Sequence, residues 1–182
     1  MDWKQHIRER GGITCKETDP EYHRLMYATI AKMVDKDADL LDDVDFMLEA
    51  VSHRGDLLEI SGYTVADNEA VVMAAVANTG NAIAYASRRL RGDRKMVRAA
   101  IHGGKTSGPP AIAYASDALR DDREMALEAI QEEPDSLLYI SVRLRNDTEM
   151  QNEAARVLGI SPARVAAAVE ETTRRGGVSL RE

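Results

Sequence analysis

The stretch MVRAAI, residues 96–101, decides the fold of this chain. Its apolar side chains fall at positions i, i+1, i+4 and i+5, which places them along one stripe of an α-helix. Blocks of the same pattern begin at residues 46, 71, 125 and 150, so that successive copies start 25, 25, 29 and 25 residues apart. A constant period of roughly 20 to 50 residues is typical of stacked repeats, in which each unit is too small to bury its own apolar face.

A second helical segment follows the first in most copies. It reads AIAYASRRLR at residues 82–91, AIAYASDALR at 111–120 and SLLYISVRLR at 136–145. We expect each of these segments to form one continuous helix, joined to the first helix by turn residues. The residues predicted to N-cap the first helices are Asp67, Asp93, Asp122 and Asp147, and those that close the second helices, next to the C-terminal dipole, are Arg91, Arg120 and Arg145.

These patterns predict an all-α fold of stacked short helical hairpins, an α-solenoid-like array with a capping helix at each end. The length of 182 residues fits one domain. We expect N-terminal helices over residues 1–40, a five-unit array over 42–155, and a C-terminal capping helix with a tail over 156–182. Ser161 and Pro162 are typical of the start of that last helix.

Composition narrows the class of protein further. The chain is 44% hydrophobic but only 4% aromatic, so the core is expected to consist of Ala, Val, Leu, Ile and Met. Cys15 is the single cysteine, which excludes an internal disulfide. The start of the chain has no apolar run of the signal-peptide or membrane-spanning kind, so we expect a cytoplasmic protein that does not contact membranes.

The repeat pattern resembles a known family. Residues 67–93 and 93–122 share an acidic start, an apolar first helix and the run Ala-Ile-Ala-Tyr-Ala-Ser followed by Leu-Arg. This pattern resembles a bacterial repeat family of unknown function over about residues 42–155. The resemblance implies helical hairpins and no catalytic residues. In size, acidity and helical build the chain is also similar to the phage-derived inhibitors of CRISPR nucleases.

No catalytic or metal site is predicted from the residue pattern. Residues 102–108 contain Gly-Lys-Thr, the end of a phosphate-binding loop, but the first glycine of that motif would fall at Ala99, within a predicted helix. A four-residue insertion explains these residues better, as an exposed loop that either contacts a partner or tolerates length. The four histidines lack metal-ligand spacing. We therefore expect no enzyme, no metal and no cofactor.

Two groups of residues are candidates for partner binding. Residues 88–105 are rich in Arg and Lys, whereas the segments before and after them are acidic. This basic stripe is either ion-paired with neighbouring units or a docking site for phosphate or an acidic protein. The repeated tyrosines either pack against the next unit or form an exposed contact ladder. The candidates are Arg88, Arg89, Arg94, Lys95, Arg98 and Lys105 of the stripe, and Tyr85, Tyr114 and Tyr139 of the ladder.

We expect this protein to act by binding. The most specific hypothesis is an inhibitor of phage or mobile-element origin that docks on a CRISPR nuclease ribonucleoprotein, its acidic faces competing for the channel that holds nucleic acid. The alternative is an adaptor or scaffold that grips a cellular protein or peptide. A further alternative is direct DNA binding through residues 88–98, with an affinity that falls as salt rises.

Overall fold

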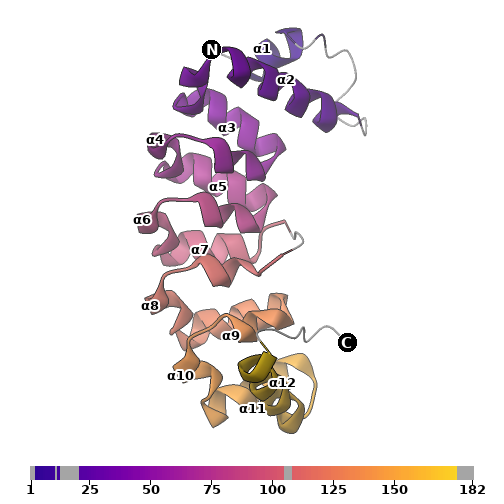
Figure 1. Cartoon of the computed structure of the whole chain (residues 1–182), viewed down its shortest axis with the longest axis vertical. Helices are drawn as coiled ribbons and strands as arrows, with labels where there is room; N and C mark the ends of the chain where they lie inside the picture. The colour runs from indigo at the N-terminus through magenta and orange to yellow at the C-terminus, as the bar shows by residue number, and fades with distance from the viewer. Residues whose placement is uncertain (1–2, 11, 13–20, 105–107, 176–182) are drawn as a thin grey trace.

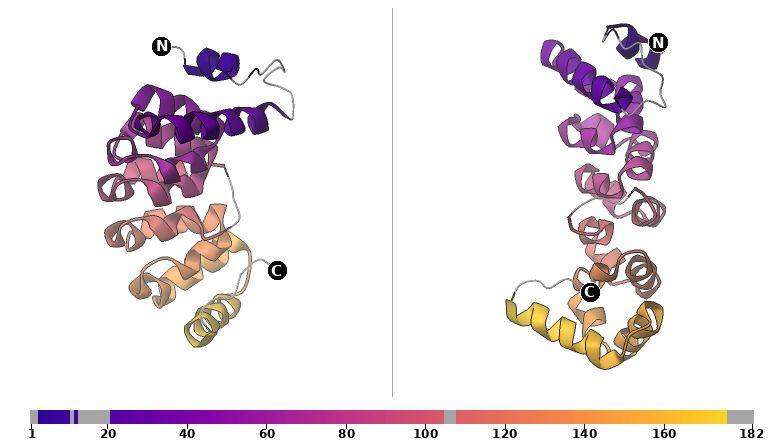
Figure 2. Two further views of the ribbon diagram at one scale, coloured as in Figure 1. Left: turned by 45° about the horizontal axis from the view of Figure 1, so that its top comes forward. Right: turned by 90° about the vertical axis from the view of Figure 1, so that its right-hand side faces the viewer.

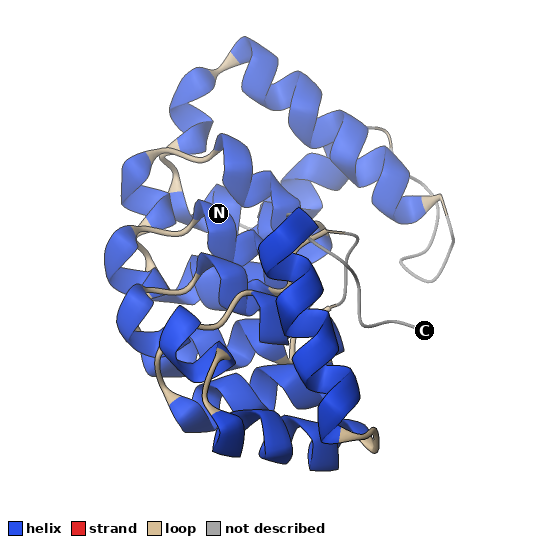
Figure 3. Cartoon of the chain, turned by 60° about the horizontal axis from the view of Figure 1, so that its bottom comes forward, coloured by secondary structure: helices blue, strands red, loops and turns tan. Residues whose placement is uncertain are grey.

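The computed structural model describes residues 3–10, 12, 21–104 and 108–175. Every regular element in these ranges is a helix, and these ranges contain no strand (Figure 3). The prediction of an all-α chain is confirmed. The described part begins with α1 (Trp3–Arg10) and α2 (Tyr22–Lys36), which are close to the two N-terminal helices predicted from the sequence.

Five longer helices follow one another through the molecule. They lie side by side in chain order, and the views of Figures 1 and 2 agree on this arrangement. Their first turns are held by an Asp or Asn side chain that accepts a hydrogen bond from a backbone N–H, as Asp93 does from Met96 at 2.8 Å. These helices are α3 (Val44–His53), α5 (Glu69–Asn78), α7 (Arg94–Ile101), α9 (Arg123–Glu132) and α11 (Thr148–Leu158).

One predicted N-cap is wrong. The side chain that caps α5 is Asn68, which accepts from the backbone N–H groups of Ala70 and Val71. Asp67 instead lies at the end of the short helix α4 (Tyr63–Ala66), which precedes α5. The other three predicted N-caps, Asp93, Asp122 and Asp147, are confirmed.

The prediction that each second segment forms one continuous helix is wrong. Each of these segments is a 3-10 helix, followed by two or three extended or turn residues and then by a four-residue α-helix. We call one long helix with the 3-10 helix and short helix that follow it a unit. The 3-10 helices are η2 (Gly55–Ile60), η3 (Gly80–Tyr85), η4 (Ala111–Tyr114) and η5 (Pro134–Leu138), and the short helices are α4 (Tyr63–Ala66), α6 (Arg88–Arg91), α8 (Asp117–Arg120) and α10 (Val142–Arg145).

A serine side chain marks two of these breaks. The backbone of Ser87 is extended, with ψ of 157°, and its hydroxyl accepts a hydrogen bond from Leu90 N–H at 3.3 Å. Ser141 caps α10 in the same way, through Leu144 N–H at 3.1 Å. A serine side chain that bonds to the backbone offers an alternative to the helix interior. Ser87 and Ser141 therefore start a new helix.

The break also joins neighbouring units. The extended residue before each short helix donates its N–H to a carbonyl at the end of the preceding unit's short helix, a group that has no partner within that helix. Ser87 donates to Ala66 at 2.8 Å, and Ser141 donates to Arg120 at 2.9 Å. Ser116 makes the same contact with Arg91, and Gly62 donates to Leu41, which ends the 3-10 helix before the first unit.

The core consists of small and aliphatic side chains. Val71, Val72, Ala75 and Val76 of α5 are fully buried, and the equivalent positions of the other long helices are buried as well, except Gln151 of α11, which is half-buried. At the N-terminal end α2 packs on α3, and the 3-10 helix η1 (Ala38–Leu41) connects the two. At the C-terminal end α12 (Pro162–Arg175) packs on α11 (Figure 1).

The insertion after α7 has a structural role at its first residues. In the unit before it, the side-chain amide of Asn78 accepts from Gly55 N–H at 2.9 Å and donates to Ser52 O at 3.2 Å. In the next unit the backbone of Gly104 takes this place, accepting from Gly80 N–H at 2.8 Å and donating to Ala77 O at 3.4 Å. A Cβ on Gly104 would lie 1.9 Å from Asn78 O, so glycine is required there.

Candidate functional site

Two cations of the basic stripe, Arg94 and Arg98, are ion-paired with the next unit. Arg98 of α7 contacts Glu124 and Glu128 of α9, each at 2.8 Å. Arg94 contacts Asp122, the residue that caps α9, and Glu124. These contacts raise the pKa of Arg98, above all through its hydrogen bond to Glu128. The charges of Arg94 and Arg98 are therefore balanced within the chain.

The same ion pair recurs at the following junction. Arg123 is the first residue of α9, as Arg94 is of α7, and it contacts Asp147, Glu149 and Glu153 of the next long helix. The hydrogen bond to Glu153 raises the pKa of Arg123. The contacts of Arg94 are thus part of the repeat, although the sequence pattern did not reveal an equivalent residue.

Arg89 belongs to a clamp between units. It donates to the carboxylate of Asp67 at 3.1 Å and to the Asp67 carbonyl at 2.8 Å, and Ser87 donates to the same carboxylate. The serine hydroxyl and then the guanidinium lower the pKa of Asp67. Arg143 and Ser141 make the same contacts to Asp121.

Comparison of the junctions shows that the clamp residues change together. Where Asp67 and Asp121 end a short helix, Arg89 and Arg143 reach them from the next unit. At the junction between them the aspartate is replaced by Gly92, and Ala118 stands where the arginine would be. The loss of both partners at one junction identifies Arg89 primarily as a residue that joins units.

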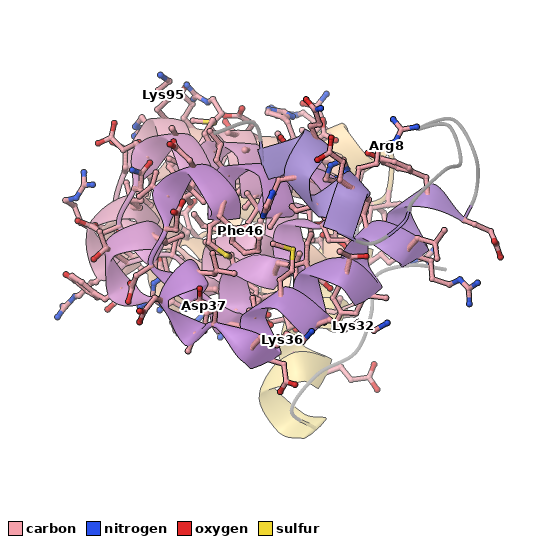
Figure 4. All side chains as sticks on the ribbon, turned by 90° about the horizontal axis from the view of Figure 1, so that it is seen from above. Arg8, Lys32, Lys36, Asp37, Phe46 and Lys95 are labelled. Atoms are coloured by element: carbon pink, nitrogen blue, oxygen red, sulfur yellow. The ribbon has the colours of Figure 1, made fainter. Side chains whose placement is uncertain are left out.

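Two cations of the stripe have no ion pair among the described residues. Arg88, the first residue of α6, and Lys95 of α7 are exposed and contact no carboxylate in that part of the chain. In Figure 4, Lys95 projects from the edge of the stack, far from Lys32 and Lys36 of α2, while Phe46 lies inside. The sixth cation predicted, Lys105, lies outside the described residues.

The three tyrosines lie at equivalent positions, at the end of each 3-10 helix. Tyr85 is 40% exposed, whereas Tyr114 and Tyr139 are partly buried against the core. Burial and then a hydrogen bond with Glu59 of the preceding unit raise the pKa of Tyr85. Tyr114 and Tyr139 thus pack on the core, whereas Tyr85 is exposed; a role of the tyrosines in partner contact stays a prediction.

These tyrosines line a row of three hollows. Hollow A, of about 320 Å³, lies between Tyr85 and Tyr114 and includes Arg54 and Pro109. Hollow B, of about 180 Å³, is lined by Arg88, Arg91, Tyr114, Ala115, Ser116 and Asp117. Hollow C, of about 340 Å³, is lined by residues that include Asp117, Arg120, Tyr139, Ser141, Val142 and Arg145.

Shared residues connect the hollows. Tyr114 lines hollows A and B, and Asp117 lines hollows B and C. Hollows B and C are the same place in successive units, because the arginine that ends one short helix faces the tyrosine and serine of the next unit. Arg91 with Tyr114 forms one copy, and Arg120 with Tyr139 forms the other.

The arginines that close the short helices are more than helix-end charges. The Nε atoms of Arg91, Arg120 and Arg145 are buried and have no hydrogen-bond partner in the described part of the chain. Arg120 contacts Asp117, and Arg145 donates to Leu138 O at 2.8 Å, but no described residue accepts from Arg91. Sequence reasoning assigned these residues to the helix dipole; their recurrence beside the repeated tyrosine was the signal for a shared surface.

Comparison with known proteins adds a family match. Residues 68–120 and 105–145 are similar to the family described as Domain of unknown function (DUF4116). The match includes hollows B and C and the three tyrosines, but its description assigns no activity. No curated protein and no solved structure matches the chain.

The described residues give no support for a metal site or a phosphate-binding loop. They contain no group of three or more His, Cys, Asp or Glu side chains that could hold a metal ion. Gly103 and Gly104 follow helix α7, not a strand, and pack against backbone carbonyl oxygens of Val76 and Asn78. A phosphate would be repelled there. None of the described helices is long and apolar enough to cross a membrane.

Proposed function

We propose that this protein is a non-enzymatic binding protein, a single-domain α-solenoid-like repeat array with caps at α2 and α12, which holds a protein partner along the row of hollows. The observation that carries the proposal is the continuity of that row. Tyr114 links hollow A to hollow B, and Asp117 links hollow B to hollow C. Hollows B and C are lined by equivalent positions of successive units. Stacked helical repeats commonly bind extended partners along such surfaces.

The balance of exposed residues favours this surface over the basic stripe. Arg89, Arg94 and Arg98 already contact carboxylates of neighbouring units, so a partner there would have to displace existing contacts. The rim of the hollows instead carries Val142, which is 62% exposed, and Asp117, whose side chain is 93% exposed. These residues begin successive short helices and differ in chemistry between units, as expected where a surface determines which partner binds.

Affinity capture with a matched pair of variants tests the proposal. The full chain is used as bait in lysate of its native cells, beside Val142→Lys on the rim of hollow C and Val157→Lys on α11. Both valines are exposed, so neither change disturbs the core. We expect wild type and Val157→Lys to recover the same protein and Val142→Lys to lose it. Recovery unaffected by Val142→Lys would refute binding along the row.

Two narrower hypotheses stay predictions. Inhibition of a CRISPR nuclease predicts reduced DNA cleavage when this protein is added to such a ribonucleoprotein, and unchanged cleavage across a broad panel would remove it. DNA binding through residues 88–98 predicts an affinity that falls steeply with salt and is lost when Arg89, Arg94 and Arg98 are reversed to Glu.

A further inference from the structure

Hollows B and C have a charge opposite to that of the molecule as a whole. Their linings include Arg88, Arg91, Arg120 and Arg145 but only one acid, Asp117. The complete chain carries a net charge of −7. Because an arginine fork binds carboxylates with paired hydrogen bonds, an anionic group is the complementary ligand.

Hollow B has the greatest unused capacity for such a ligand. Arg88 and Arg91 both line it, and neither contacts a carboxylate in the described part of the chain. The Nε of Arg91 is buried without a partner. A buried polar atom without a hydrogen bond is costly, and the same atom is left without a partner in Arg120 and Arg145. The Nε of each of these three equivalent arginines thus lacks a hydrogen-bond acceptor among the described residues.

The spacing of these arginines specifies the shape of the ligand. They occupy the same position in successive units, and packed helices lie about 8–10 Å apart. An extended peptide advances about 3.3 Å per residue, so every third residue of such a peptide meets an equivalent position in the next unit. Tyrosines 114 and 139 lie beside the arginines and offer apolar edges to the residues between.

From these observations we infer that hollows B and C bind an extended acidic segment of a partner protein, with Asp or Glu at every third position opposite Arg91, Arg120 and Arg145. This inference rests on the proposed function and specifies the chemistry of its partner. A nucleic-acid strand fits less well, because every nucleotide carries a negative phosphate and one of them would meet the exposed carboxylate of Asp117. A peptide can place a neutral residue there.

Synthetic peptides provide the test. One fluorescent probe has Glu at every third position among Ala and Ser, and a second has the same composition with its Glu residues adjacent. Titration of the full chain should give tighter binding of the spaced probe by about tenfold, because only its register matches the units. Equal affinity for the two probes would overturn the inference, since simple attraction between charges does not depend on register.

Variants then locate the site. Arg91→Gln with Arg120→Gln should weaken binding of the spaced probe by about tenfold or more. The control is Arg24→Gln with Lys32→Gln, which removes the same charge from exposed positions of α2 and should leave binding unchanged. Circular dichroism confirms that the variants fold. If the two double variants weaken binding equally, or single-stranded DNA of equal charge binds more tightly at the same site, the inference is wrong.

The two tests fail separately. Loss of partner capture by Val142→Lys together with equal affinity for both peptides leaves the proposed function intact and removes the acidic segment. Capture that survives Val142→Lys, together with register-dependent peptide binding, removes the proposed mode of partner binding while hollows B and C still recognise carboxylates.

Discussion

At the scale of single residues, His102 forms a pH-dependent contact between two long helices. Its Nε2 lies 2.7 Å from Glu128 and its Nδ1 lies 3.2 Å from Glu132, both on α9. Only the charged imidazolium can donate from both ring nitrogens at once. The hydrogen bond with Glu128 raises the pKa of His102, with further help from Glu132, and outweighs the opposite effect of burial. Burial alone would raise the pKa of Glu128, but hydrogen bonds from His102 and Arg98 lower it.

The sign of the pH effect follows from these shifts. Because the pKa of His102 is raised in the folded state, its contribution to stability is complete below the unfolded value of about 6.5 and is lost as pH rises through the folded value. We expect the free energy of unfolding of wild type to fall relative to His102→Gln between about pH 6 and pH 8. Solvent exposure limits the effect to less than about 1 kcal/mol. Urea unfolding at several pH values measures it, and a constant difference between the two proteins would contradict it.

At the scale of elements, a serine side chain stabilises the break in two of the four second segments, at Ser87 and Ser141. Ser141 caps α10 and also donates to Asp121, whereas the equivalent Ser116 makes no side-chain cap hydrogen bond. Ser141→Ala should therefore lower the free energy of unfolding by about 1 kcal/mol. Ser116→Ala is the matched control and should cost clearly less. Equal losses in urea unfolding would show that the cap does not stabilise the break.

The long helices could be predicted from the sequence, whereas the short elements could not. Apolar spacing and Asp N-caps are local signals. Three of the five long helices have the predicted Asp as their N-cap, and in α5 the N-cap is the residue after the predicted one. The run AIAYASRRLR has good helical composition throughout. Its break at Ser87 depends on the carbonyl of Ala66, which lies in another unit. No periodicity within the run contains that information.

The candidate surface was only partly predictable for the same reason. The tyrosines and arginines were visible as repeated residues, but their proximity across a junction was not. The pairing of Arg98 with Glu128 likewise joins residues 30 positions apart, which a comparison of charges within one segment does not detect. Aligning the units with one another, as for Gly92 and Ala118, recovers part of this information.

At the scale of the whole molecule, the arrangement makes stability a property of neighbouring units. If the long helices form the proposed array, each unit contacts only the units beside it, and a local defect should spread over that distance. Ile83 of η3 is fully buried between its neighbours. Ile83→Ala should lower the free energy of unfolding by about 2–5 kcal/mol, because it removes apolar volume from a packed site. Hydrogen exchange should then show protection falling most in α5 and α7, and least in α12. A uniform fall along the chain would instead indicate one cooperative unit, in which the order of the helices has no bearing on how stability is distributed.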